Sequence, residues 1–244
     1  MELARPLKAD LHIHTGDDIY DNIAYSSKGL IDEAARQCFE VISITNHDCD
    51  FYTEELYEYA REQGILLIRG MELTYDKQHI LLINFDDAAS INTPEDVISR
   101  KKEENLVIAP HPYFPWAPSC GRLLNSRPEL FDAVEYAHLY NKSINFNRKA
   151  VRRAAELGLP MVGTSDSHTL DQLGYTYTLI HAEKTPESVV AAVKAGRVEL
   201  VTRPMTLAAF LWIIAKMKYG SAVRIIGDVF HRLSQERALP VNNR

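Results

Sequence analysis

The segment Asp10-Leu-His-Ile-His14 decides how the rest of the chain is interpreted. In an extended strand, residues two apart point to the same side, so His12 and His14 present two imidazoles together while Leu11 and Ile13 face apolar packing. Two histidines at a strand end are weak evidence by themselves. The pattern predicts one part of a metal site whose other ligands must come from later in the chain.

The composition is that of an ordinary soluble globular protein. The 244 residues include 46% hydrophobic and 25% charged residues, and the formal net charge is −6. This charge gives no reason to expect tight binding to a nucleic-acid backbone, which depends on clustered Lys and Arg. Long nucleic acid is therefore not an expected partner. A small anionic substrate would need local positive charge, which metal ions can supply.

Several features favour a cytoplasmic location. Cys38, Cys49 and Cys120 are an odd number at wide spacing without a Cys-x-x-Cys pair, which argues against disulfides and for a reducing compartment. No basic stretch followed by an apolar run opens the chain, so we expect no secretory signal. The most apolar stretch, 207–214, is too short to span a bilayer before Lys216 interrupts it.

Short apolar runs alternate with amphipathic runs over most of the chain. The predicted strands are 7–13, 40–46, 65–69, 79–85, 106–109, 131–136, 160–164 and 176–180, and the predicted helices are 26–38, 52–63, 93–104, 145–157 and 185–195. Ser27 is the expected N-cap of the first helix. Repeated alternation in one chain of this size indicates an α/β barrel.

The character of the chain changes near its end, where helical runs are predicted at 207–218 and 223–237. We therefore divide the chain into a barrel domain at 1–203 and a helical extension at 204–244. The extension is expected to pack on the barrel wall. The alternative is a contact with a second copy, giving a homo-oligomer, or with a membrane surface.

Residues of metal-ligand type fall at or just beyond the ends of the predicted strands. They are His12, His14, His47, Glu72, His111, His138, Asp166 and His168. Because the carboxyl ends of barrel strands meet at one face, we expect these side chains to converge there.

These ligand types suffice for more than one divalent ion, each of which needs about three or four protein ligands. We assign His12, His14, Glu72 and Asp166 to one ion, Glu72 as a bridge with His111 and His138 to a second, and Asp21, His47 and His168 to a third. Mixed imidazole and carboxylate ligation suits Zn, Mn or Fe without choosing among them.

Five ordered motifs resemble the PHP (polymerase and histidinol phosphatase) superfamily. They are Asp10-Leu-His-Ile-His14, Thr45-Asn-His-Asp48, Gly70-Met-Glu72, Ala109-Pro-His-Pro112 and Ser165-Asp-Ser-His168. The resemblance covers residues 7–200. It implies a distorted seven-stranded (β/α) barrel, here with extra C-terminal helices, up to three metals, and phosphoester hydrolysis.

Two ligand positions stay open under this resemblance. The family usually has an Asp or His soon after the His-x-His pair, where Asp17, Asp18 and Asp21 compete in this chain. The number of residues that separates each candidate from His47 in the next motif favours Asp21. The alternative to His138 as a ligand is Glu135, which could also orient the ligating side chains through hydrogen bonds without binding the metal itself.

The remaining predictions concern catalysis and substrate. Glu72 and Asp166 are predicted to orient a metal-bound hydroxide or to accept its proton. Arg148 is predicted to bind the phosphate, and His79 to contact the ligands or the substrate. Asp10 is predicted to orient an imidazole.

We therefore expect a metal-dependent phosphoesterase that uses two to three divalent ions and a metal-bridged hydroxide to hydrolyse a small phosphate ester, either a phosphorylated metabolite or a nucleotide. One alternative is a 5′ to 3′ exonuclease or oligonucleotidase of the same fold. An alternative of another class is a PHP module that binds or regulates without turnover.

Overall fold

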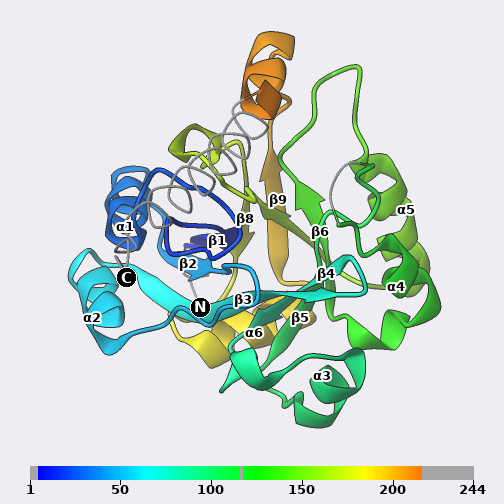
Figure 1. Cartoon of the computed structure of the whole chain (residues 1–244), viewed down its shortest axis with the longest axis horizontal. Coiled ribbons are helices and arrows are strands. Elements are labelled where there is room, and N and C mark those ends of the chain that lie inside the picture. Colours follow the sequence, from blue (N-terminus) through cyan, green and yellow to red (C-terminus); the bar gives the residue numbers. More distant parts are fainter. Residues whose placement is uncertain (1–4, 116–117, 216–244) are drawn as a thin grey trace, which may run out of the picture.

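A computed structural model describes residues 5–115 and 118–215 of the chain. Its strands are β1 (Leu7–Ile13), β2 (Val41–Ile44), β3 (Leu66–Tyr75), β4 (Gln78–Ile83), β5 (Leu106–Ala109), β6 (Ala133–Ala137), β7 (Met161–Thr164), β8 (Thr176–Ile180) and β9 (Val198–Thr202). Its helices are α1 (Ser27–Arg36), α2 (Glu54–Glu62), α3 (Pro94–Arg100), α4 (Gly121–Ser126), α5 (Asn147–Leu157) and α6 (Pro186–Lys194). Figure 1 shows the helices around a curved sheet.

The nine strands of the described residues form one sheet in the order β7-β6-β5-β4-β3-β2-β1-β8-β9. Neighbours β1, β2 and β3 are parallel, as are β5, β6 and β7, whereas β4 is antiparallel to both β3 and β5. β8 and β9 add two further antiparallel pairs beside β1. The expected seven-stranded (β/α) barrel is therefore not what the strands form, because β4 and β8 each run antiparallel to both of their neighbours.

The β3–β4 hairpin explains one of these differences. Asp76 and Lys77 both have positive φ angles, of 46° and 58°, which is the geometry of a tight two-residue turn between antiparallel strands. β3 also continues well past Arg69, the end predicted for it. Glu72 consequently lies within the strand, paired with Leu81 of β4, rather than at its end.

The barrel is nearly closed where β7 approaches β1. Ile13 and Ser167 form an isolated parallel bridge. Beside it, the His14 amide donates to the Ser167 carbonyl at 3.1 Å, and the Asp166 amide donates to the His12 carbonyl at 2.9 Å. These bonds join the ends of the first and seventh strands and so bring two distant motifs together.

Gly163 allows β7 to pack closely against the last two strands. Its amide donates to Thr178 Oγ1 at 2.8 Å. A Cβ atom at this position would lie 2.4 Å from Leu200 Cδ1 and 2.7 Å from the Tyr177 carbonyl oxygen. The lack of a side chain at residue 163 therefore lets β7 approach β8 and β9 without displacing Leu200 or the Tyr177 carbonyl.

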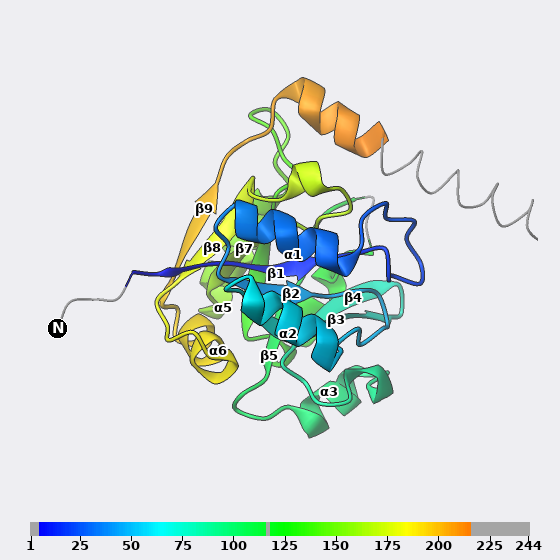
Figure 2. The same cartoon turned by 90° about the vertical axis from the view of Figure 1, so that its left-hand side faces the viewer.

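Helices cover the outside of the sheet. Figure 2 shows α1 and α2 side by side over β1, β2 and β3, where Leu30, Ile31 and Leu56 are buried against strand residues. The N-cap of α1 is Ser26, whose hydroxyl accepts from the Gly29 amide, so the prediction of Ser27 was one residue late. Within the described part of the chain, no helix has the length and hydropathy needed to cross a membrane.

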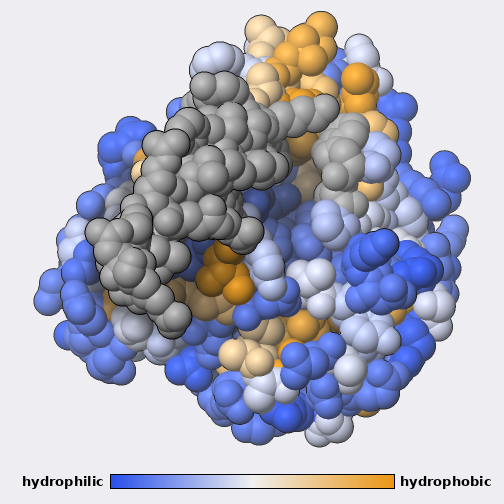
Figure 3. Space-filling model, in the orientation of Figure 1, coloured by the Kyte–Doolittle hydropathy of each residue, from blue (hydrophilic) through white to orange (hydrophobic). Residues whose placement is uncertain are grey.

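The described residues include only the start of the predicted C-terminal extension. Residues 207–215 are helical, and Phe210 and Ile213 pack against Phe114 and Leu139. Figure 3 shows apolar residues gathered over this helix. The second predicted helix, 223–237, lies outside the described residues. The domain division at residues 203 and 204 and the homo-oligomer contact stay predictions.

Candidate metal centre

His12 and His14 at the end of β1 are each held by a carboxylate at Nδ1. His12 Nδ1 lies 2.7 Å from Glu135 Oε1, and His14 Nδ1 lies 3.1 Å from Asp18 Oδ2. With a proton on each Nδ1, both Nε2 atoms present lone pairs, and these two atoms are only 3.1 Å apart. Two facing lone pairs repel each other, so a cation or a proton belongs between them.

Two more carboxylates complete this group. Asp166 Oδ1 lies 3.4 Å from Nε2 of both His12 and His14. Glu72 Oε1 lies 3.4 Å from His12 Nε2, and Glu72 Oε2 lies 3.3 Å from His14 Nε2. Around a tetrahedral ion with bonds of about 2.0–2.1 Å, ligand atoms lie roughly 3.3 Å apart. Asp166 and the two imidazoles thus form a group whose donor atoms lie at the spacing that one ion requires, and Glu72, the fourth residue predicted for this ion, contacts both imidazoles beside it.

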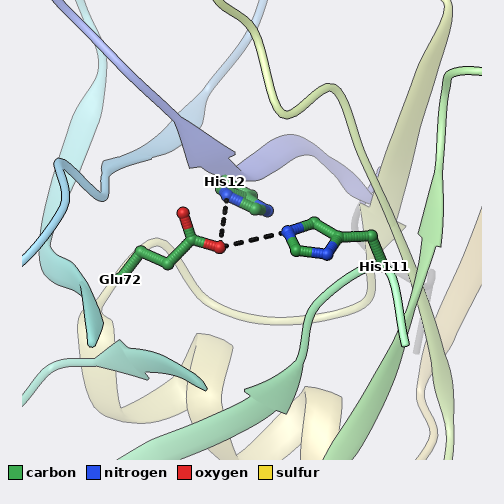
Figure 4. A group of neighbouring side chains, drawn as sticks. All are labelled: His12, Glu72 and His111. Atoms are coloured by element: carbon green, nitrogen blue, oxygen red, sulfur yellow. Dashed lines mark hydrogen bonds and ion pairs between the residues drawn. The ribbon is translucent and has the colours of Figure 1, made fainter. Parts of the chain in front are cut away.

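Glu72 contacts most of the imidazoles of the centre, and Figure 4 shows one of its carboxylate oxygens facing both His12 and His111. Its Oε1 atom is 3.2 Å from His111 Nε2 and 2.8 Å from His79 Nδ1, and its Oε2 atom is 3.0 Å from His47 Nε2. Burial raises the pKa of Glu72, but the surrounding imidazoles outweigh burial and hold the pKa well below its usual value. An ionised carboxylate with imidazoles at both oxygens is the arrangement of a bridging ligand.

A third group lies at the open side of the centre. Asp21 Oδ2 is 2.9 Å from His168 Nε2 and 3.6 Å from His47 Nδ1, which brings together the three residues predicted for a third ion. Asp18 joins them, because its Oδ2 atom is 2.8 Å from His47 Nδ1 and also accepts from the His47 amide. Burial and the neighbouring His14 lower the pKa of His47, but Glu72 and Asp18 raise it overall to about 9.

The aspartates of the first loop therefore divide between different roles. Asp18 and Asp21 both face His47, so the prediction of a single aspartate at this place in the loop was incomplete. Asp17 instead accepts a hydrogen bond from Ser27 Oγ at 2.6 Å. Asp17 belongs to none of the clusters of converging donor atoms found among the described residues.

The prediction for Asp10 is wrong. Its Oδ1 atom accepts from the backbone amides of His12, at 3.3 Å, and Ser165, at 3.1 Å. It therefore ties β1 to the chain after β7, and the imidazoles are held by Glu135 and Asp18. Asp10 precedes the two histidines on β1, and its partners are the Ser165 side chain and the backbone amides of Ser165 and His12.

Glu135 is fully occupied by hydrogen bonds. Besides His12 Nδ1, it accepts from Thr164 Oγ1 and from the His111 amide. All three partners belong to the walls of the centre. Glu135 therefore orients His12 and fixes the start of the loop at His111.

Three predicted site residues lie elsewhere than expected or stay untested. His138 belongs to no group of converging donor atoms among the described residues, and its Nε2 atom is 3.0 Å from Gln172 Nε2. Arg148 is exposed in the first turn of α5, at the carboxyl end of the barrel strands, so its contact with phosphate stays a prediction. His79 lies against Glu72, in the place that was predicted for His138.

The chain matches known proteins along most of its length. Residues 10–122 match the family model described as PHP domain, and residues 145–198 match the model described as PHP-associated. An uncharacterized protein from Methanocaldococcus jannaschii is 28% identical over 157 residues, which cover 60% of this chain and 91% of that protein.

Solved structures share the fold. A two-domain protein from Bacteroides vulgatus, which contains a predicted PHP-like metal-dependent phosphoesterase, has a TM-score of 0.60 at 21% identity, over 86% of this chain and 69% of that chain. The lesion-specific endonuclease PfuEndoQ from Pyrococcus furiosus has a TM-score of 0.55 at 14% identity, over 85% of this chain and 66% of that chain.

Proposed function

The chain carries a PHP domain at residues 10–122 and a PHP-associated segment at 145–198, and on this premise we propose that it is a metal-dependent phosphoesterase that hydrolyses a small phosphate ester. The observation that carries the proposal is the set of donor atoms from His12, His14 and Asp166, which lie 3.1–3.4 Å apart, with Glu72 oxygens 3.3–3.4 Å from both imidazoles. Donor atoms at this spacing fit a divalent cation.

The donor atoms of the centre fall into three groups, which would hold up to three ions. The first group is His12, His14 and Asp166 with Glu72 beside them, the second is Glu72 with His111 and His79, and the third is Asp21 with His47 and His168, where Asp18 would orient His47. Five buried or half-buried carboxylates contact the imidazoles of these groups, namely Asp18, Asp21, Glu72, Glu135 and Asp166, and bound cations would neutralise their negative charge.

Bound ions would supply a hydroxide near neutral pH and neutralise the phosphoryl oxygens. The protein's own contribution is to orient the reactants and to accept a proton. Asp166 suits the second task, since its side chain is 20% exposed whereas that of Glu72 is 1% exposed. Burial raises the pKa of Asp166, but His12 and His14 lower it overall, so the carboxylate is ionised and able to accept a hydrogen bond from a bound water.

The charge distribution favours a small substrate. Exposed basic side chains pair repeatedly with acidic ones, as in Lys28–Glu55, Arg61–Glu58, Arg122–Asp76 and Arg127–Glu95. Such pairs reduce the positive charge available to a polyanion, and among the described residues the exposed basic side chains of α5 without an ion pair are Arg148, Lys149 and Arg152. Nucleic acid is the second candidate, and the fold shared with PfuEndoQ is the observation that favours it.

The test is a metal count on the purified protein followed by assays of phosphate release. The substrate panel contains phosphomonoesters, dinucleotides, short oligonucleotides and a duplex with an abasic site. We expect at least two ions per chain and turnover of a phosphomonoester or dinucleotide, lost in His111→Ala and kept in the surface control His181→Ala. Turnover confined to oligonucleotides would favour the second candidate, and fewer than two ions with no metal-restored turnover would refute an enzyme.

A further inference from the structure

Gln172 connects the two sides of the barrel mouth from a fully buried position. It ends the 3-10 turn that follows His168. Its Oε1 atom accepts from the backbone amides of His168, at 2.8 Å, and Thr169, at 2.7 Å. Its Nε2 atom lies 3.0 Å from His138 Nε2, just beyond the end of β6.

These contacts fix which atom of the Gln172 amide is which. Two backbone N–H groups point at one atom of the amide, and only an oxygen can accept from both. The opposite assignment would set an NH₂ group against two donors and would lose both hydrogen bonds. The group beside His138 is therefore an NH₂ donor.

The tautomer of His138 follows from this assignment. Since Gln172 Nε2 donates, His138 Nε2 must accept, and its lone pair is already used. A neutral imidazole with an accepting Nε2 carries its proton on Nδ1. Burial lowers the pKa of His138 to about 4, which is consistent with a neutral ring.

The proton on Nδ1 has no acceptor among the described residues. His138 is 2% exposed, and its Nδ1 atom is buried without a hydrogen-bond partner. Leaving a buried donor unpaired costs about 1–3 kcal/mol, so the Nδ1–H group calls for an acceptor that the described residues do not supply. His138 lies at the barrel mouth, because Ala137 pairs with Thr164 in the register of β6 and β7, two residues before Asp166.

We propose that His138 is a substrate-binding residue rather than a metal ligand, and that its Nδ1–H donates to a phosphoryl oxygen while Gln172 holds the ring in place. The identity of the acceptor rests on the proposed function. The tautomer and the lack of metal coordination do not, since they follow from the hydrogen bonds of Gln172.

The first test is ¹⁵N NMR of the histidines in the metal-free and zinc-loaded protein, with His138 assigned by comparison with His138→Ala. We expect a protonated Nδ1 and an unprotonated Nε2 in both states. Inorganic phosphate should then shift the Nδ1 proton of the zinc-loaded protein. Loss of the Nδ1 proton on adding zinc, or no response to phosphate, would overturn the proposal even if the protein hydrolysed none of the esters tested.

The second test separates a ligand from a substrate contact. His138→Ala should keep the wild-type number of ions, whereas His111→Ala should lose at least one. Removal of one hydrogen bond to a charged oxygen should lower kcat/KM in His138→Ala by roughly 10- to 150-fold. His138→Asn retains a donor near the position of Nδ1 and should recover part of this loss. Loss of an ion in His138→Ala, or an unchanged kcat/KM, would contradict the inference.

A third variant tests Gln172 as the positioning residue. Gln172→Glu keeps an oxygen for the His168 and Thr169 amides but places a second oxygen against His138. The His138 proton should then move to Nε2, with the metal count unchanged and kcat/KM reduced. A Gln172→Glu protein whose His138 keeps its proton on Nδ1 would show that Gln172 does not set the tautomer.

Discussion

Replacement of Asp18 by Asn tests the internal support of the metal centre. Asp18 Oδ1 accepts from the amides of Tyr20, at 2.8 Å, and Asp21, at 3.1 Å. Its Oδ2 atom accepts from the His47 amide and faces Nδ1 of His14 and His47. An Asn side chain has one oxygen, so its NH₂ group must face one of these two sets of donors.

The cost can be worked from that geometry. At least two hydrogen bonds to a carboxylate are lost, each worth about 1.5–3 kcal/mol, so Asp18→Asn should lower the free energy of unfolding by roughly 3–6 kcal/mol. Zinc affinity should fall about 10- to 100-fold, because His14 and His47 lose the group that orients them.

Urea unfolding of the metal-free protein and calorimetric zinc titration measure the two effects of Asp18→Asn. Asp17→Asn is the matched control in the same loop, since an Asn carbonyl can still accept from Ser27 Oγ. We expect the control to change the unfolding free energy by less than about 1 kcal/mol. If Asp18→Asn matched Asp17→Asn in both stability and zinc affinity, the assignment of Asp18 as the support of two imidazoles would be refuted.

Four further predictions address the centre and the barrel. Glu72→Ala should lose more than one ion in a metal count, because both of its oxygens face imidazoles; loss of a single ion would contradict the bridging arrangement. The pKa of His47 is raised to about 9 in the metal-free protein, so its charged form stabilises that protein fully below about pH 6.5 and less as the pH rises toward 9. Since an ion requires the neutral ring, zinc affinity at the third group should rise up to about tenfold per pH unit until pH 9, with proton release in calorimetry; affinity independent of pH would argue against His47 as a ligand. Asp10→Asn should change the unfolding free energy by less than about 1 kcal/mol at pH 6, because burial raises the pKa of Asp10 to about 7 and the amide oxygen can accept the same backbone bonds; a large loss in urea unfolding would show that its charge is needed. Gly163→Ala should cost about 1–3 kcal/mol in the same assay, since its Cβ would meet Leu200 and the Tyr177 carbonyl; wild-type stability would mean that β7 is not packed as described.

Local sequence patterns determined much of the secondary structure. β1 begins and ends as predicted at Leu7 and Ile13, because its apolar residues are buried without interruption. α3 begins after Thr93, where the cap, the following proline and Asp96 form the predicted start of a helix. β9 was missed, because Val198–Thr202 is half-exposed and carries no continuous apolar run.

The residue types of the centre were also readable from the sequence. Imidazoles and carboxylates that follow strands predict a metal site whatever the exact strand order, since strand ends meet at one face of a barrel. His12, His14, Glu72 and Asp166 therefore come together as expected. Asp21 likewise lies close to both His47 and His168, the other two residues predicted for the third ion.

Only the tertiary structure decided what each of these side chains does. Asp10, Asp18 and Glu135 are all carboxylates near histidines in the sequence or the predicted sheet, yet one binds backbone and two hold imidazoles. Likewise, His79 rather than His138 contacts Glu72. The β3–β4 hairpin places His79 beside Glu72, whereas His138 Nε2 contacts Gln172 Nε2. Hydrogen bonds depend on distances of a few tenths of an ångström between segments far apart in the chain, and no local pattern encodes those distances.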